Sequence, residues 1–205
     1  GIELARRRSG GGTVFHDRGN LCFSFINTAK GHDRHKNSSI VADALNKRLG
    51  IPAKVNDRSD VLVDGKKISG SAFRITKDRA YHHGTVLVRS DLGMLDKCIK
   101  SPELNKIESR ATNSVRSVVS NLIVHRPDLD LEDVASAVEA HVREVQQISA
   151  ASVSLGMDDL TEKDHAEVAK LKQKSWLFGE TPAFSIPYEM HFAWGSVRAD
   201  IDVAR

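Results

Sequence analysis

The dipeptide Asp64-Gly65 is the feature of this sequence that most restricts its fold. It separates two short runs of residues that favour extended backbone, Val61-Leu62-Val63 and Lys66-Lys67-Ile68. An Asp-Gly pair between such runs is the strongest short-range sign of a two-residue hairpin turn. The chain is therefore predicted to contain an antiparallel sheet.

A helix is predicted directly before this hairpin. Residues 38–49 repeat apolar side chains at helical spacing, and Asn37 or Ser38 can cap the first turn. Gly50 follows the last apolar residue and is suited to the left-handed position that ends a helix. The sheet therefore has a helix available to cover one of its faces.

Further helices are predicted in the second half of the chain. Residues 91–99 could form a short helix, and residues 162–172 a longer one that Thr161 caps. Residues 131–145 form an amphipathic pattern that begins at the cap residue Asp130. The apolar face of this pattern consists of Val134, Val138, Val142 and Val145.

Extended segments are predicted at both ends of the chain. Residues 1–6 resemble a strand that enters a loop at residues 7–12, and residues 13–15 return to strand-forming types. Residues 183–203 alternate apolar and polar side chains as strands do. The order of strands, helix, hairpin, helices and strands predicts an α+β fold with a mostly antiparallel sheet flanked by helices.

Gly179 and Pro182 interrupt a helix-rich stretch just before the last alternating pattern, which predicts a domain boundary there. We therefore expect one domain over residues 1–177 and the start of another over residues 178–205. Because the chain opens on glycine and stops without a closing element, both domains are expected to be truncated.

Composition excludes several classes of protein. Hydrophobic residues make up 40% and charged residues 28%, and no apolar run reaches the length of a membrane span. Two cysteines are too few for a disulfide framework and lack zinc-site spacing. The net charge of +3 suits an anionic nucleotide or an acidic protein as well as it suits nucleic acid.

The segment from Arg6 to Asp17 combines three arginines with Gly10-Gly11-Gly12. Guanidinium groups and closely approaching backbone amides can hold a phosphate or a carboxylate. The segment lacks the P-loop arrangement, and Phe15 stands where a dinucleotide fingerprint needs its third glycine. An anion-binding loop and a simple tight connection both fit this pattern.

Two other segments carry candidate functional side chains. Alternation along a strand sends Lys66 and Lys67 to opposite faces, so that one can enter a pocket, although two solvated lysines also fit. It separates His82 from His83 in the same way, so the pair is not expected to share a metal ion. The residues from His32 to His35 are expected to be solvated surface.

Together, these segments resemble the motifs of the lipoate-protein ligase A family. The family pattern Arg-Arg-x-Ser-Gly-Gly-Gly-x-Val-Phe-His-Asp-x-Gly-Asn matches residues 6–20, Lys-Ile-Ser-Gly-Ser-Ala matches residues 67–72, and His-His-Gly-Thr matches residues 82–85. The similarity continues through residues 114–117 and Asn121-Leu122. Each motif is weak alone, but their conjunction in this order is specific.

The resemblance implies a catalytic domain of the type shared with biotin ligases and a reaction in two steps. The carboxylate of lipoate first attacks the α-phosphate of ATP, which gives lipoyl-AMP and pyrophosphate. The amine of an acceptor lysine then attacks lipoyl-AMP, and AMP leaves. Because the first step brings two anions together, positioned cations and amides should lower its barrier.

The resemblance also implies a role for each matching residue. Lys67 is the expected catalytic residue, and Asp60 is the expected ligand of Mg²⁺. The family commonly has Asn before this aspartate, whereas this chain has Ser59. Nucleotide contacts are expected from Arg7, Gly12, Thr13, Val14, Phe15 and Lys67. Lipoate contacts are expected from Arg7, Ser9, Gly11, Gly12, Lys67, His83 and Gly84.

The expected ligands are ATP, Mg²⁺ and lipoate. The expected acceptors are lipoyl domains of 2-oxoacid dehydrogenase complexes and the glycine cleavage carrier protein, with no role for nucleic acid or a membrane. The family occurs in the bacterial cytoplasm and in mitochondria, and we expect a mitochondrial protein here.

Three other functions remain open from the sequence. A lipoyl or octanoyl transferase of the same superfamily would use preformed lipoyl-AMP or an acyl carrier, and Cys98 is its candidate nucleophile, although its neighbours predict a half-buried helix position. A non-catalytic adenylate-binding module would bind without forming product. A nucleic-acid role rests only on residues 6–8 and 66–67, and the aromatic residues of a single-strand binder are missing there.

Overall fold

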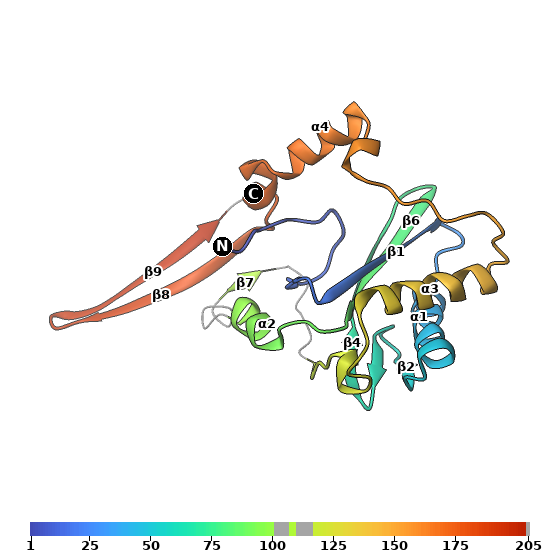
Figure 1. The fold of residues 1–205 in the computed structure, drawn as a ribbon. Coiled ribbons are helices and arrows are strands. Elements are labelled where there is room, and N and C mark those ends of the chain that lie inside the picture. The colour runs from blue at the N-terminus through green and yellow to red at the C-terminus, as the bar shows by residue number, and fades with distance from the viewer. Residues whose placement is uncertain (101–106, 110–116, 204–205) are drawn as a thin grey trace. The chain divides into compact units, whose positions relative to one another are not determined.

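The computed structural model describes residues 1–100, 107–109 and 117–203 and divides the chain into two compact units. We call the first the core unit; it comprises Ser9–Ile99 and Ser114–Ala150. The second, which we call the outer unit, comprises Gly1–Arg8, Lys100–Asn113 and Ala151–Arg205. Figure 1 shows the elements of both units.

Two antiparallel sheets form the framework of the core unit. The first has the strand order β1-β6-β5, with β1 at Asn20–Thr28, β5 at Ser71–Ile75 and β6 at Arg79–Leu87. Strands β1 and β6 pair along their whole length, from Asn20 opposite Leu87 to Thr28 opposite Arg79. The sequence expectation of a mostly antiparallel sheet is confirmed here.

The second sheet contains the predicted hairpin. Its strands are β2 at Ala53–Val55, β3 at Val61–Val63 and β4 at Lys66–Ser69, in the order β2-β3-β4. Asp64 and Gly65 have φ of 48° and 73°, the paired left-handed conformations of a two-residue hairpin turn. The Asp-Gly prediction is therefore confirmed.

Two helices pack on each other beside these sheets (Figure 1). Helix α1 runs over Arg34–Leu49 and ends at Gly50, whose φ of 67° is left-handed as predicted. The predicted start is wrong, because Asp33 is the cap and accepts a hydrogen bond from the backbone N of Lys36. The first turn is polar, so it carried no apolar signal.

Helix α3 runs over Leu131–Val145 from the predicted cap Asp130. Its buried residues are Val134, Ala137 and His141, with Val138 partly buried against the core. The predicted all-valine face is therefore only half right, since Val145 is 46% exposed and His141 continues the buried stripe instead. Spacings of three and four residues place these side chains on one face.

Helix α2 at Leu92–Ile99 and the short 3₁₀ turn η2 at Leu122–Val124 complete the core unit. The helix itself was predicted, but Cys98 on it is exposed, so the expected half-buried position is wrong. Helix α2 buries none of its residues, and its apolar neighbours therefore do not shield the thiol.

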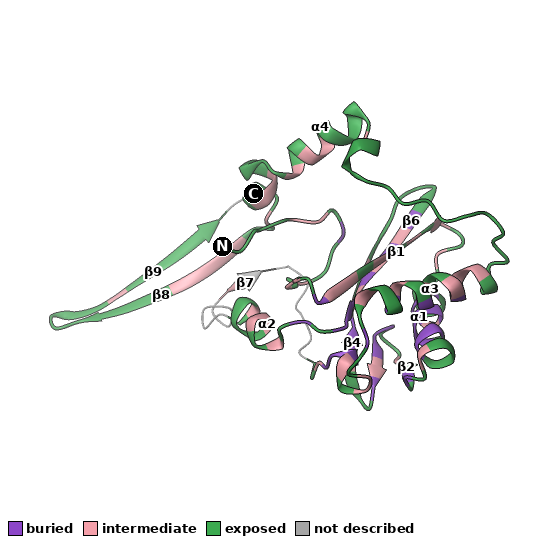
Figure 2. Cartoon of the chain, in the orientation of Figure 1, coloured by how far each residue is buried: buried purple, intermediate pink, exposed green. Residues whose placement is uncertain are grey.

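Among the residues that the structure describes, the hydrophobic core lies in the core unit, where Figure 2 shows buried residues on α1, β2, β4 and β6. Helices α1 and α3, both sheets and η2 contribute to it. Its buried members are Val41, Ala42, Leu45, Ile51, Ala53, Val61, Val63, Ile68, Val86, Val88, Leu122, Leu129 and Val134.

The outer unit contains a third antiparallel sheet, β7-β8-β9, with β7 at Glu108–Ser109, β8 at Phe184–Phe192 and β9 at Gly195–Val203. The predicted helix is α4 at Glu162–Leu171, capped by Thr161 as expected. A 3₁₀ turn, η3, at Met157–Asp159 precedes α4, and a π-helical segment, η4, at Ser175–Gly179 follows it.

Two predicted strands do not form. Residues 1–6 contain no strand, and residues 13–15 lie in a loop that continues until β1 begins at Asn20. Strand-forming residue types alone do not make a strand, and no strand among the described residues pairs with either segment. The expected boundary between residues 177 and 178 remains a prediction.

The described residues form a mixed structure of helices and antiparallel strands, which confirms the predicted α+β class. A parallel bridge also joins Lys67 to Val119 outside the named sheets. No helix in the described part of the chain combines the length and apolarity needed to cross a bilayer.

Candidate active site

The β3–β4 hairpin separates the two lysines as alternation predicted. Lys66 is exposed, whereas the side chain of Lys67 is only 21% exposed and places Nζ 2.7 Å from Oδ1 of Asp60. The backbone of Lys67 is held on both sides, because its N donates to the O of Val118 and its O accepts from the N of Ser120. Lys67 is therefore a fixed cation with a nearby carboxylate.

A tight turn over residues 56–60 positions Asp60. The side-chain oxygen Oδ1 of Asn56 accepts hydrogen bonds from the backbone N of Arg58, at 3.0 Å, and of Asp60, at 2.9 Å. Ser59 adopts a φ of 65°, and the hydroxyl of Ser38 donates to its carbonyl oxygen at 2.8 Å. The carboxylate of Asp60 is thus held in a buried position.

The φ of Ser59 explains why asparagine suits this position. Asn is among the non-glycine residues most often found in the left-handed region, which is costly for most side chains. Ser59 has φ 65° and is 5% exposed. The left-handed backbone at Ser59 is therefore one that the asparagine of the family pattern would also adopt.

Gly70 lies between the side chain of Lys67 and strand β6 and contacts both. A Cβ atom built on Gly70 would lie 2.9 Å from Cε and 3.1 Å from Nζ of Lys67, closer than van der Waals contact allows. The carbonyl oxygen of Gly70 accepts from the backbone N of Thr85 at 3.0 Å. The absence of a side chain at Gly70 therefore leaves room for the end of Lys67 beside β6.

Strand β6 carries both histidines, on opposite faces as predicted. His83 places Nε2 2.6 Å from the hydroxyl of the buried Ser9. Gly84 is buried, and a Cβ there would come within 2.5 Å of the ring of Phe23 and 2.9 Å of the O of Gly70. Ser9, His83, Gly84, Gly70 and Lys67 therefore form one connected group.

His82 lies on the other face, where it is 0% exposed and packs edge-on against Phe23. Burial, and then the neighbouring charges of His32, Arg34 and His83, lower the pKa of His82 to about 4. A neutral ring at physiological pH fits this apolar position. His32 also packs there, against Phe73 and His82, so the expectation that it is solvated surface is wrong.

The predicted anion-binding loop follows Ser9 and is mostly exposed. Gly11 has a φ of 105°, which favours glycine, and Gly12 and Phe15 are half-buried whereas Thr13 and Val14 are exposed. Arg7 is half-buried and belongs to the outer unit. The loop thus presents backbone and glycine positions directly after the Ser9–His83 contact.

Hydrogen bonds to Asp17 hold the C-terminal end of this loop in place. Its Oδ1 accepts from the backbone N of Gly19 at 2.9 Å, and its Oδ2 accepts from the backbone N of Asp91 at 2.7 Å. Burial alone would raise the pKa of Asp17, but hydrogen bonds from Asp91, Gly19 and Ser90 outweigh it and lower the pKa. Asp17 in the family motif therefore fixes the loop rather than reacting.

A cluster that sequence reasoning missed lies at the start of β1. The amide Nδ2 of Asn20 is 2.7 Å from Nδ1 of His16, and Sγ of Cys22 is 3.5 Å from the same nitrogen. Burial raises the pKa of the Cys22 thiol, which disfavours the reactive thiolate. Alternation along β1 places Asn20 and Cys22 on the same face of the strand, but the sequence does not show that His16 of the preceding loop lies against that face.

Metal binding was assigned to Asp60 alone. Among the described residues, no three or more His, Cys, Asp and Glu side chains are grouped closely enough to hold a metal ion. A single carboxylate still suits Mg²⁺, which is often bound by one or two carboxylates together with water and substrate phosphates. The carboxylate of Asp60 could therefore supply one protein ligand to Mg²⁺.

Comparison of the sequence with known proteins shows which family the chain belongs to. Residues 1–143 match the model of the lipoyl protein ligase A/B catalytic domain. The chain belongs to this family. It is 37% identical over 209 residues to a lipoate-protein ligase A of Psychrobacter cryohalolentis, covering 98% of the chain and 61% of that relative.

Solved structures of the family superpose on the chain. P. falciparum LipL1 in complex with lipoate matches with a TM-score of 0.68 and 26% identity, over 100% of this chain and 59% of that one. A lipoate-protein ligase A bound with ATP matches with a TM-score of 0.66 and 25% identity, over 88% and 73%. The chain thus spans about three fifths of the length of the first two relatives.

Proposed function

We propose that this chain carries the catalytic centre of a lipoate-protein ligase, which activates lipoate with ATP and transfers the lipoyl group to a lysine of a lipoyl-domain protein. The observation that carries the proposal is the largely buried pair of Lys67 and Asp60, 2.7 Å apart and connected through Gly70 to the Ser9–His83 contact. Relatives that bind lipoate and ATP share this fold.

In the first step, a carboxylate oxygen of lipoate forms a bond to the α-phosphorus of ATP, and the bond from that phosphorus to pyrophosphate breaks. Negative charge accumulates where the two anions meet. The Nζ of Lys67 is a positioned cation that stabilises this charge, and its fixed backbone reduces the cost of orienting it. The neighbouring Asp60 keeps the ammonium in place before the substrates arrive.

In the second step, the amine of the acceptor lysine attacks the acyl carbon, AMP leaves with the bonding electrons, and the amine loses a proton. Backbone amides of the loop from Gly12 to Phe15 and the side chain of Arg7 are the proposed contacts of the nucleotide. Ser9, Gly11, His83 and Gly84 are the proposed wall of the lipoyl site. Asp60 is the proposed Mg²⁺ ligand, and the ion would neutralise phosphate charge.

The adjacent lysine provides a matched control. Lys67→Arg keeps a positive charge for Asp60, so it avoids leaving a buried carboxylate unpaired. Arginine cannot place its charge at the same point, so lipoate-dependent exchange of pyrophosphate into ATP should fall by about 10²-fold. Lys66→Arg, on the exposed face of the same hairpin, should retain activity. Equal activity of the two variants would contradict the role of Lys67.

A further inference from the structure

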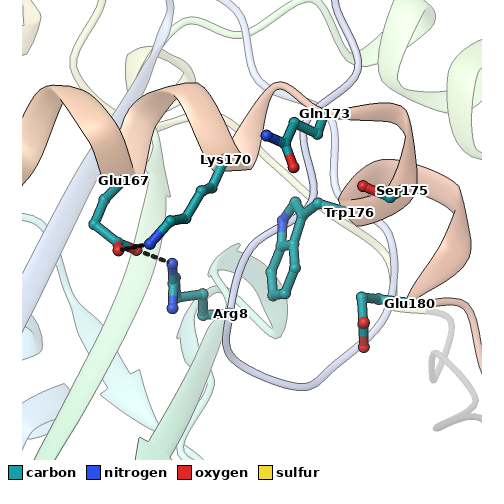
Figure 3. A pocket seen from close by; sticks show the side chains of 7 residues that line it. All are labelled: Arg8, Glu167, Lys170, Gln173, Ser175, Trp176 and Glu180. Carbon is teal, nitrogen blue, oxygen red and sulfur yellow. Dashed lines mark hydrogen bonds and ion pairs between the residues drawn. The ribbon is translucent and has the colours of Figure 1, made fainter.

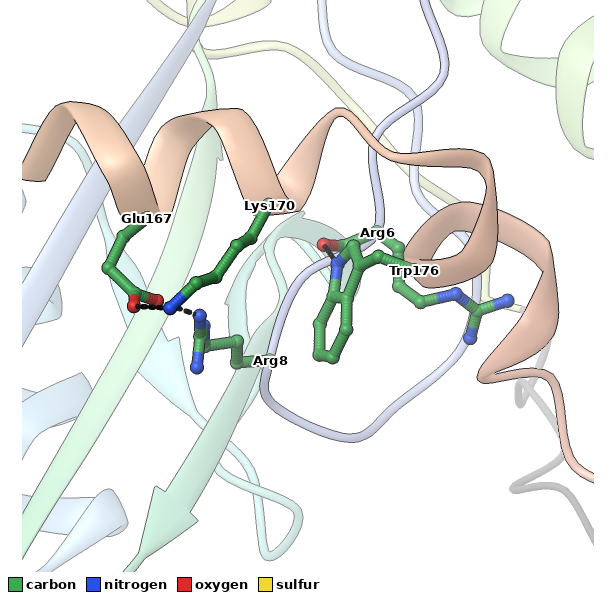
Figure 4. Close-up of polar contacts among 5 residues, drawn as sticks. All are labelled: Arg6, Arg8, Glu167, Lys170 and Trp176. Carbon is green, nitrogen blue, oxygen red and sulfur yellow. Dashed lines mark hydrogen bonds and ion pairs between the residues drawn. The ribbon is translucent and has the colours of Figure 1, made fainter.

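The segment just before the predicted adenylate loop is fastened within the outer unit. Arg6 donates from Nε to the carbonyl oxygen of Leu177 at 2.8 Å and from Nη2 to the hydroxyl of Thr181 at 2.7 Å. In return, Nε1 of Trp176 donates to the carbonyl oxygen of Arg6 at 2.9 Å, as Figure 4 shows. These hydrogen bonds join residue 6 to the π-helical segment η4 and the turn after it.

Arg8 is held by the same region of the outer unit. Its guanidinium forms an ion pair with Glu167 on α4 and lies 5.4 Å from the centre of the Trp176 ring, within cation–π range. Lys170 also pairs with Glu167, at 2.7 Å, and together with the Arg8 charge this lowers the pKa of Glu167. The carboxylate therefore remains charged as an anchor for Arg8.

Trp176 is the residue that both contacts share. Figure 3 shows its ring in a pocket between the Arg8 and Glu180 side chains, with Glu167 and Lys170 beyond Arg8. The indole N–H binds the backbone of Arg6, while the indole face supports the guanidinium of Arg8. One side chain therefore fixes the residues on both sides of Arg7.

We propose that Trp176 is a positioning residue, which presets the backbone at Arg7 so that this arginine meets the adenylate without a large ordering cost. The inference rests on the proposed function, because the contact of Arg7 with the adenylate is part of that proposal. A flexible arginine loses rotamer and backbone freedom when it binds, and restraint in advance reduces that loss. Trp176 itself touches no substrate.

The test is a double-mutant cycle read by calorimetric binding of lipoyl sulfamoyl adenosine, a non-hydrolysable analogue of lipoyl-AMP, to the full chain. Trp176→Phe keeps an aromatic ring but loses the hydrogen bond to Arg6, so binding should weaken about fivefold. In an Arg7→Ala background the same change should have no further effect, because Trp176 acts through Arg7. A general structural role would weaken binding equally in both backgrounds.

Two further variants keep the test independent of folding. Thr181→Val removes one hydrogen bond to Arg6 at nearly constant shape and should weaken binding in the same Arg7-dependent way. Glu167→Gln should weaken it too, whereas Glu162→Gln, at an exposed position of the same helix α4, should not. Equal effects of Trp176→Phe with and without Arg7 would overturn this inference alone. Failure of the wild-type chain to bind the analogue would overturn the proposed function as well.

Discussion

Single residues explain how the candidate site is held. Alternation along the hairpin predicted that only one of Lys66 and Lys67 could point inward, and Lys67 does so. The pairing of Lys67 with Asp60 could not be predicted, because it depends on the left-handed Ser59 and on the Asn56 side chain within one turn. The family motif predicts that Asp60 binds a metal ion, and this role of Asp60 remains a proposal.

Gly70 supplies a prediction at this scale. In Gly70→Ala, the new methyl group would meet the end of Lys67, which must move because the competing contacts are with a flexible side chain. We expect about tenfold lower adenylate formation with a change of less than about 1 kcal/mol in the free energy of unfolding. Gly156→Ala, whose Cβ would make only an ordinary contact, is the control. Unchanged activity of Gly70→Ala would show that Lys67 need not occupy this position.

His82 supplies a prediction about pH. Its pKa is about 4 in the folded chain and about 6.5 when unfolded, so protonation favours the unfolded state. Its contribution to stability is therefore complete above pH 6.5 and is lost as the pH falls towards 4. Between pH 7.5 and pH 5, protonation of His82 should lower the free energy of unfolding by about 2 kcal/mol. The variant His82→Leu should lack this part of the pH dependence. Denaturant titrations of both proteins at pH 7.5 and pH 5 measure this difference. The same pH dependence in His82→Leu and in the wild type would contradict the role given to His82.

At the scale of elements, signals in short local sequence were the reliable ones. Asp64-Gly65, Gly50 and the caps Asp130 and Thr161 all act within a few residues, and each lies where it was predicted. The start of α1 was missed because its first turn is polar. His141 was missed because a buried histidine does not register in an apolar pattern.

Strands β8 and β9 allow a matched comparison with β1 and β6. Both pairs join nine residues to nine in antiparallel register. Strands β1 and β6 pack on the core, with Val86 buried and Phe23 and Phe25 partly buried. In contrast, β8 and β9 bury no residue and leave Tyr188, Met190, Phe192, Ile201 and Val203 on one exposed apolar face.

Packing, not the number of hydrogen bonds, should therefore separate the two strand pairs. We expect backbone amides of β8 and β9 to exchange with solvent at least about tenfold faster than those of β1 and β6, because local opening exposes little additional apolar surface. Hydrogen exchange followed by mass spectrometry on the 205-residue chain measures both at once. Equal protection would mean that the apolar face of β8 and β9 is covered in solution.

At the scale of the whole chain, most residues of the candidate site belong to the same unit as the core, whereas Arg7 belongs to the outer unit. The buried residues of the described structure all fall within the core unit, together with Ser9, Asp60, Lys67 and His83. The outer unit contributes the contacts that hold Arg6 and the strands β8 and β9. The noncontiguous composition of both units could not be predicted from local patterns, because contacts between distant segments define them.

The central claim is most directly tested by mass spectrometry of a purified lipoyl domain after incubation with this protein, lipoate, ATP and Mg²⁺. We predict the addition of one lipoyl group that requires ATP, that is slower by about 10²-fold in Lys67→Arg and that is retained in Lys66→Arg. Addition only from preformed lipoyl-AMP, with none from free lipoate and ATP, would contradict the ligase assignment and identify a transferase instead.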